Sequence, residues 1–153
     1  MSPILSRSAA ALAIALSLSV AHAATKPTPQ NPIQPFEVEG VAHYENGVLT
    51  VNGVELELGH NSKFEDWWLN RATLNGRWVK VEGFHQSGRF QVDEVDGENR
   101  DNDVELMGWV SDGTLWGYQA SDESLDPFNH QWVQLDCTLS QNSHQISQCH
   151  LDN

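Results

Sequence analysis

Residues 44–58 read YENGVLTVNGVELEL. The Asn-Gly pairs at 46–47 and 52–53 are the dipeptides that two-residue type I′ hairpins prefer, because both central residues take positive φ. From Val54 to Leu58, apolar residues alternate with glutamates, which is the period of a half-buried strand. This stretch therefore predicts a three-stranded meander, with strands over residues 36–44, 48–51 and 54–58.

Residues 62–72 are predicted to form one short helix. Ser62 and Glu65 fit a capping box, and an apolar face would carry Phe64, Trp67, Trp68 and Leu69. Two more strands are predicted over residues 78–84 and 90–95. Three strands, a helix and two strands are the order of an OB-type barrel. The predicted fold class is all-β with one short helix, built as an OB-like five-stranded barrel plus a second, degenerate β repeat.

Several short motifs in this region resemble a known family. They are the Gly40-Val41 opening, TVNGV at 50–54, GRWVKVEG at 76–83 and GRFQVDEV at 88–95. The pattern resembles the small OB-like repeat domains of unknown function found in exported bacterial proteins, and it is similar to periplasmic bacterial OB-fold proteins. The resemblance spans residues 40–96 and implies a fold, without implying any functional residue.

A second copy of the pattern is predicted downstream. WVKVE at 78–82 has a counterpart in WVQLD at 132–136, and Gln91-Val92 has one in Gln145-Ile146, both displaced by 54 positions. A constant displacement favours internal duplication, although two alternating hairpins can also align by chance. Residues 122–130 are predicted to be a loop or a single turn. Two tandem small barrels, or one barrel with a sheet extension, both fit this pattern.

The amino-terminal region is predicted to direct export. Arg7, the apolar run 9–20 and the small-x-small sequence Ala21-His22-Ala23 are typical of a secretory signal cleaved after Ala23. The apolar run is shorter than the roughly 20 residues of a membrane-spanning helix, so a permanent anchor is the weaker interpretation. The expected location is periplasmic or secreted. The predicted organisation is a signal peptide at 1–23, a Pro-rich tether at 24–35, an OB-like domain at 36–97, an acidic linker at 98–103 and the second repeat at 104–153.

The charge of the chain argues against two classes of partner. With 21 acidic and 8 basic residues, its formal net charge at pH 7 is −13. Affinity for nucleic acid rests mainly on cationic side chains, and anionic lipid repels an acidic surface. We therefore expect neither a nucleic acid nor a membrane as partner, and instead a protein, a peptide or a small molecule.

Cys137 and Cys149 are predicted to form a disulfide. They occupy the two strands of the last predicted hairpin, and an exported chain with two cysteines is normally oxidised. The alternative is a metal site that combines these cysteines with histidines such as His144 and His150. No recurrent zinc-ligand spacing is present, which favours the disulfide.

The sequence contains no recognisable catalytic motif, so we expect no enzyme activity, no cofactor and no metal. The acidic run 93–105 is interpreted as a linker, with a calcium site as the alternative. The histidines outside the signal are interpreted as solvated loop residues.

Tryptophans are the remaining candidates for a binding site. Trp78 and Trp132 share the strand parity of polar residues and not that of the core valines. If that face is exposed, these rings and Trp109 can stack on a ligand; the alternative is that they are packed under other elements. The predicted function is an exported, periplasmic, non-catalytic binding or interaction module of unknown ligand. The alternative is a periplasmic metal-binding protein with His, Asp and Cys ligands.

Overall fold

The computed structural model describes residues 31–141 and 144–152, and within them the chain forms ten strands and one 3-10 turn. The predicted signal peptide, its cleavage site and tether residues 24–30 lie outside the described residues. The strands are β1 (Gln34–Glu45), β2 (Val48–Val51), β3 (Val54–Phe64), β4 (Trp78–Gln86), β5 (Arg89–Gly97), β6 (Asp103–Trp109), β7 (Thr114–Leu115), β8 (Tyr118–Ala120), β9 (Trp132–Leu139) and β10 (Gln145–Leu151), with the turn η1 at Asp126–Phe128.

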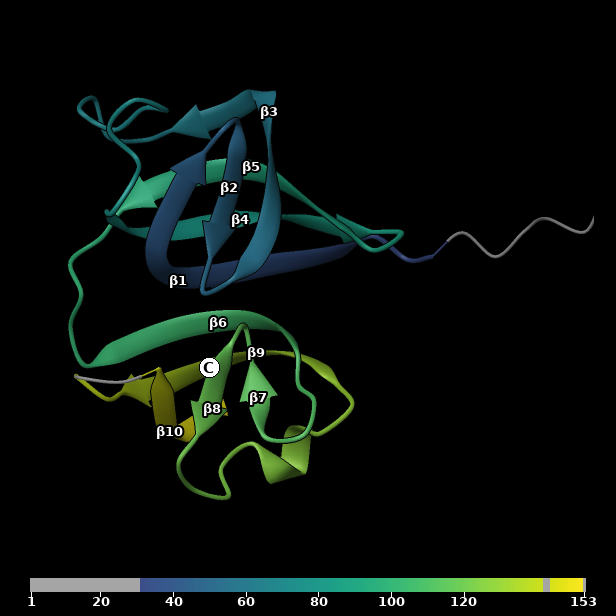
Figure 1. The fold of residues 1–153 in the computed structure, drawn as a ribbon. Helices are drawn as coiled ribbons and strands as arrows, with labels where there is room; N and C mark the ends of the chain where they lie inside the picture. Colours follow the sequence, from purple (N-terminus) through teal and green to yellow (C-terminus); the bar gives the residue numbers. More distant parts are fainter. Residues whose placement is uncertain (1–30, 142–143, 153) are drawn as a thin grey trace, which may run out of the picture. The chain divides into compact units, whose positions relative to one another are not determined.

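The first five strands close into a barrel (Figure 1). β1 pairs with β2 and with β4, β2 pairs with β3, and β3 lies parallel to β5, which pairs with β4. The all-β class and a closed five-stranded barrel with further strands are thus confirmed. β1 begins at Gln34, so the last two residues of the predicted tether belong to the barrel wall.

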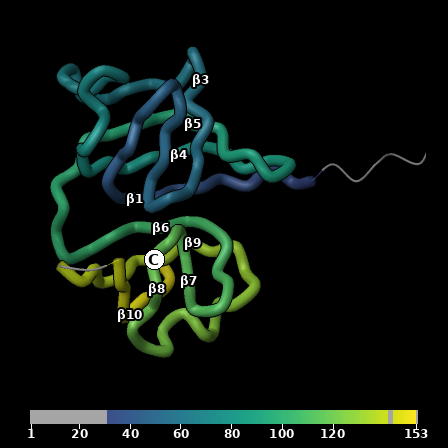
Figure 2. Tube along the Cα trace, viewed as in Figure 1, coloured from purple at the N-terminus to yellow at the C-terminus, as the bar shows by residue number. Residues whose placement is uncertain are grey.

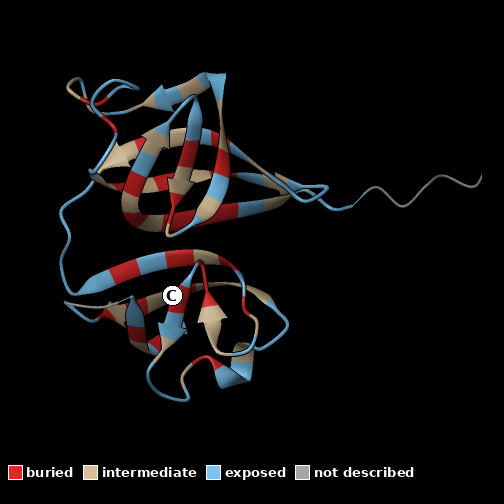
Figure 3. Ribbon diagram, viewed as in Figure 1, coloured by how far each residue is buried: buried red, intermediate tan, exposed pale blue. Residues whose placement is uncertain are grey.

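The two Asn-Gly hairpins form as the sequence predicts. Asn46, Gly47, Asn52 and Gly53 all have positive φ, as type I′ turns require. Apolar and polar residues then alternate between the interior and the surface along the strands, and this alternation is visible along β6 in Figure 3.

The predicted helix at 62–72 is wrong. β3 continues to Phe64, and residues 65–77 form isolated turns. Ser62 is not available as a helix cap, because its hydroxyl donates to the carbonyl of Val92 and accepts the amide of Gly59. Asn70 and Thr73 bond nearby backbone groups, which competes with helix formation. Trp67, expected on an apolar face, is 94% exposed.

The remaining strands repeat the pairing order of the barrel. β6 pairs with β9, β9 with β10, and β10 lies parallel to β8, which pairs with β7. A single bridge between Ser111 and Thr114 joins the start of β7 to the residues after β6. Figure 2 follows the trace from β5 into β6 and through these strands. Within the described residues the arrangement is therefore one closed barrel with further strands outside its ring. The shared order agrees with the predicted duplication, which stays a prediction.

One hydrophobic cluster extends through both halves. It includes Val38, Val81 and Leu56 from the barrel and Leu106 and Leu135 from the later strands. β1 and β6 are neighbours in the sheet, with Glu37 opposite Met107. The later strands therefore extend the barrel sheet and share its core.

The predicted disulfide between Cys137 and Cys149 is confirmed. A bulge after Ser147 brings Cys149 opposite Cys137 on β9. Closing a loop with a sequence separation of 12 residues stabilises the fold by about 3 kcal/mol in the chain-entropy treatment. The described part of the chain contains no helix long and apolar enough to cross a membrane.

Candidate functional site

Two of the three candidate tryptophans lie together, and the third lies apart. Trp109 and Trp132 are directly opposite each other on β6 and β9. Trp132 also donates its indole N–H to the carbonyl of Pro35, 2.8 Å away. Trp78 is paired with Val41 on β1, six residues from Pro35 and so about 20 Å farther along the strand.

Trp132 belongs to an aromatic cluster that covers the ends of these strands. Its ring stacks on His85 at 5.1 Å, and His85 in turn contacts Phe90 at 4.6 Å. Phe90 contacts Trp116 at 4.8 Å, and both rings contact Phe36. The cluster therefore connects the barrel to the β7–β8 hairpin.

Trp109 lines a groove at the edge of this cluster. The groove has a volume of about 160 Å³, and its lining is almost entirely apolar. Trp109 is 51% exposed, whereas Trp116 is only 8% exposed and forms part of the groove wall. We call this feature the aromatic groove, lined by Val54, Phe90, Trp109, Trp116 and Gly117.

Sequence reasoning did not identify Trp116 as part of this site. Trp116 and Gly117 both have positive φ and form the turn between β7 and β8. A tryptophan in this conformation is unusual, so propensity does not predict the turn. The feature of the sequence that favours a turn here is Gly117, a glycine at the second turn position.

Trp78 has a different environment and does not line the aromatic groove. Its indole nitrogen lies 3.4 Å from Oε2 of Glu39, and the guanidinium of Arg100 lies 5.2 Å from the ring centroid. The ring is half-buried and packs against the core. These contacts indicate that Trp78 has a packing role.

A larger hollow, which we call the acidic cleft, is lined by residues of β1, β3, β4, β5 and β6. Its volume is about 490 Å³. Phe84, 44% exposed, and Met107 supply apolar surface. The charged residues that line it are Glu37, Glu82, Asp93, Glu94 and Lys63.

Lys80 does not line this cleft itself, but it is the centre of an ion network that includes Glu37. Its Nζ lies 2.9 Å from Oε1 of Glu37 and 2.8 Å from Oε2 of Glu105. Burial raises the pKa of Glu37 to about 7, although Lys80 acts in the opposite direction. The hydrogen bond from Lys80 lowers the pKa of Glu105. Glu37 is therefore the member of this pair that takes up a proton near neutral pH.

The acidic run 93–105 contributes to two groups of carboxylates. Asp101, Asp103 and Glu105 line a separate hollow of about 460 Å³ together with Asp136 and His150. Glu65, Glu94 and Asp96 form the second group, with ligand atoms within 4.8 Å of one another. In residues 31–141 and 144–152 this is the one group of His, Cys, Asp and Glu side chains close enough to share a metal ion.

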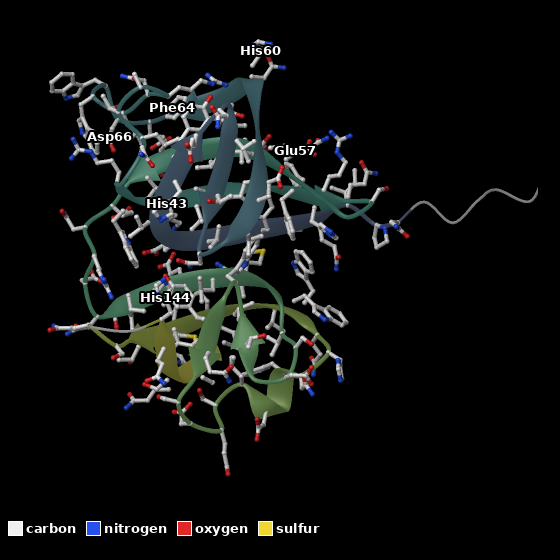
Figure 4. All side chains as sticks on the ribbon, viewed as in Figure 1. His43, Glu57, His60, Phe64, Asp66 and His144 are labelled. Carbon is white, nitrogen blue, oxygen red and sulfur yellow. A yellow bond between two sulfur atoms is a disulfide. The ribbon has the colours of Figure 1, made fainter. Side chains whose placement is uncertain are left out.

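Among the described residues, the histidines and cysteines do not combine as the metal hypothesis requires. Both cysteines are in the disulfide. Figure 4 labels His43, His60 and His144, which come from β1, β3 and the segment before β10. A metal site in the described part of the chain is thus limited to carboxylate ligands, which suit calcium better than zinc.

The carboxylate group predicts a pH-dependent stability. Burial and then Glu65 raise the pKa of Glu94, and burial and then the charge of Glu65 raise that of Asp96. Because the folded state binds these protons more tightly, stability rises as the pH falls through the raised pKa values. We expect Glu94→Gln to raise the melting temperature at pH 7 and to change it little at pH 4. Glu55→Gln, at an exposed site on β3, is the control, and an unchanged melt for Glu94→Gln at pH 7 would contradict the prediction.

Comparison of the chain with family models, with curated proteins and with solved structures gave no match. Candidate functions therefore depend on the geometry of the sites described above.

Proposed function

We propose that the chain is an exported, non-catalytic binding module that holds an apolar or aromatic side chain of a peptide or protein partner in the aromatic groove. The observation that carries this proposal is the exposure of Trp109. An indole that is half exposed at the mouth of an apolar groove has large surface to bury at low entropic cost. Aromatic residues of this kind are enriched among the residues that dominate binding energy.

Three further features support the proposal. The groove volume of about 160 Å³ suits a single side chain better than a drug-sized ligand. Its walls are fixed by ring contacts and by the hydrogen bond from Trp116 to the carbonyl of Met107. The disulfide agrees with an oxidising, exported location. The periplasmic or secreted location is part of the proposal.

The first test is a titration of the protein with the peptide Ac-Gly-Phe-Gly-NH2 and, separately, with its alanine analogue. Binding is monitored by NMR through the chemical shifts of the tryptophan indole protons. We expect saturable shifts of the Trp109 signal with the phenylalanine peptide and none with the alanine peptide. Trp109→Ala is expected to abolish binding without lowering the melting temperature, because the ring is half exposed. Trp67→Ala is the matched control, since Trp67 is 94% exposed but does not line the groove. Equal binding of both peptides, or full binding by Trp109→Ala, would overturn the proposal.

A further inference from the structure

Three glutamates lie in a row across three neighbouring strands in the wall of the acidic cleft. Glu37 on β1 is directly opposite Glu82 on β4, and Glu82 is directly opposite Glu94 on β5. Like charges at directly opposite positions destabilise a sheet. Lys80 lies within 4 Å of Glu37 and Glu82, and Glu94 has no ion-pair partner among the described residues. Lys63 on β3 is directly opposite Glu94 and also lines the cleft, but no ion pair joins these two described residues, so the carboxylates of the cleft outnumber its cations.

One carboxylate oxygen of Glu37, Oε1, accepts no hydrogen bond from the described residues. The side chain of Glu37 is only 9% exposed. Oε1 lies 2.9 Å from Nζ of Lys80, yet the contact lacks hydrogen-bond geometry, and no other described group donates to this oxygen. A buried acceptor without a donor is costly, and this oxygen belongs to a residue that lines the cleft.

Part of the cleft lining is apolar. Pro35, Phe84 and Met107 line it alongside the carboxylates. A bare metal ion gains nothing from such a surface, since hard cations are held by oxygen ligands. An alkyl chain that ends in a cationic group matches both parts, because its stem can cover the apolar surface while its head meets the carboxylates.

We propose that the acidic cleft is a second binding site, separate from the aromatic groove, for an organic cation with an aliphatic stem, such as the lysine side chain of a partner peptide. The cationic head lies beside Glu82 and Glu94, next to the buried carboxylate of Glu37. The stem lies along Phe84 and Met107. Glu82 and Glu94 thus serve as ligand-binding residues whose mutual repulsion is relieved when the site is occupied.

The protonation of Glu37 links this binding to pH. A cation in the cleft favours the ionised carboxylate, whose pKa in the free protein is about 7. Binding near neutral pH therefore releases protons, and affinity rises from pH 6 to pH 8. The charged groups that surround Glu37 are Glu39 on β1, Lys80 and Glu82 on β4, Glu105 on β6, Asp93 and Glu94 on β5, and Lys63 on β3.

The test is calorimetric titration of the oxidised protein with N-acetyl-lysine-methylamide, 1,5-diaminopentane, N-acetyl-norleucine-methylamide and Ca²⁺. We expect both amines to bind, more tightly at pH 8 than at pH 6, and the uncharged norleucine compound to bind at least tenfold more weakly. Tighter binding of the lysine compound identifies a peptide as the source of the cation, and tighter binding of the diamine identifies a free polyamine.

Variants locate the site without disturbing the fold. Glu82→Gln combined with Glu94→Gln is expected to weaken binding of the amines at least tenfold, and Glu55→Gln to change it less than twofold. Removing repelling charges leaves the protein folded, as its melt will verify. Absence of amine binding, equal binding of norleucine, or binding of Ca²⁺ in place of the amines would overturn the proposal. The aromatic groove is tested by an uncharged peptide and by Trp109→Ala, so failure of either site can be told from failure of the other.

Discussion

Replacing Lys80 with methionine is expected to lower the free energy of unfolding by about 3 kcal/mol at pH 8. The side chain of Lys80 is 21% exposed and neutralises Glu37 and Glu105 together. Without it, the buried carboxylate of Glu37 faces Glu82 and Glu105, and Lys63 is the one cation that remains in the lining of the acidic cleft. The expected loss is at the low end of that for buried ion pairs, because Glu105 is half exposed and partly screened by water.

The loss of stability should depend on pH in a defined direction. The pKa of Glu37 in the folded protein, about 7, is above its ordinary value of 4.5. Protonation of Glu37 therefore stabilises the fold fully at a pH below 4.5, and this contribution is lost as the pH rises through about 7. Lys80→Met should thus be much less harmful at pH 5 than at pH 8. Urea denaturation at the two pH values measures the difference.

Two controls separate charge from packing in this experiment. Lys80→Arg keeps the cation and should retain most of the stability. The double variant Lys80→Met with Glu37→Gln removes both charges and should recover at least half of the loss at pH 8. A Lys80→Met variant that is equally destabilised at both pH values would show that the aliphatic stem, and not the charge, is what matters.

The barrel could be predicted from the sequence because its signals are local. Each Asn-Gly pair specifies a hairpin within four residues, and the alternation after Val54 specifies which side chains face the interior. The disulfide followed from two cysteines on one predicted hairpin. In each case the residues that carry the information are neighbours in the chain or in a single hairpin.

The errors arose where distant parts of the chain determine the local structure. Ser62 fits a helix cap in isolation, yet its hydroxyl is bonded to Val92 on β5. The aromatic groove combines residues from β3, β5, β6 and the β7–β8 turn, which no spacing in the sequence brings together. Strand parity places Trp78 and Trp132 with polar residues instead of the core valines, but parity does not indicate which ring lies beside a groove.

The pairing of the strands strengthens the case for duplication beyond the sequence. Gly40 pairs with Val79 and Val41 with Trp78; in the later strands Gly108 pairs with Val133 and Trp109 with Trp132. The proposed copies thus agree in register as well as in order. If the halves share an origin, Trp109 occupies the place of Val41, and an exposed aromatic ring has been introduced where the two halves meet.

Trp116→Ala is expected to lower the free energy of unfolding by about 3–5 kcal/mol, in contrast to the small effect expected for Trp109→Ala. Trp116 is 8% exposed, contacts Phe36 and Phe90, and lies over Gly108, where an added Cβ would be 2.5 Å from its indole nitrogen.

The turn at Trp116 allows a sharper control than alanine. Asparagine is favoured at a position with positive φ, so Trp116→Asn relieves the backbone while removing the ring. If the ring holds the two halves together, Trp116→Asn should still lose most of the stability that Trp116→Ala loses, as measured by urea denaturation with the disulfide intact. Wild-type stability in Trp116→Asn would mean that the turn, and not the aromatic cluster, secures the β7–β8 hairpin. The walls of the aromatic groove would then have no fixed support, and the proposed binding site would lose its structural basis.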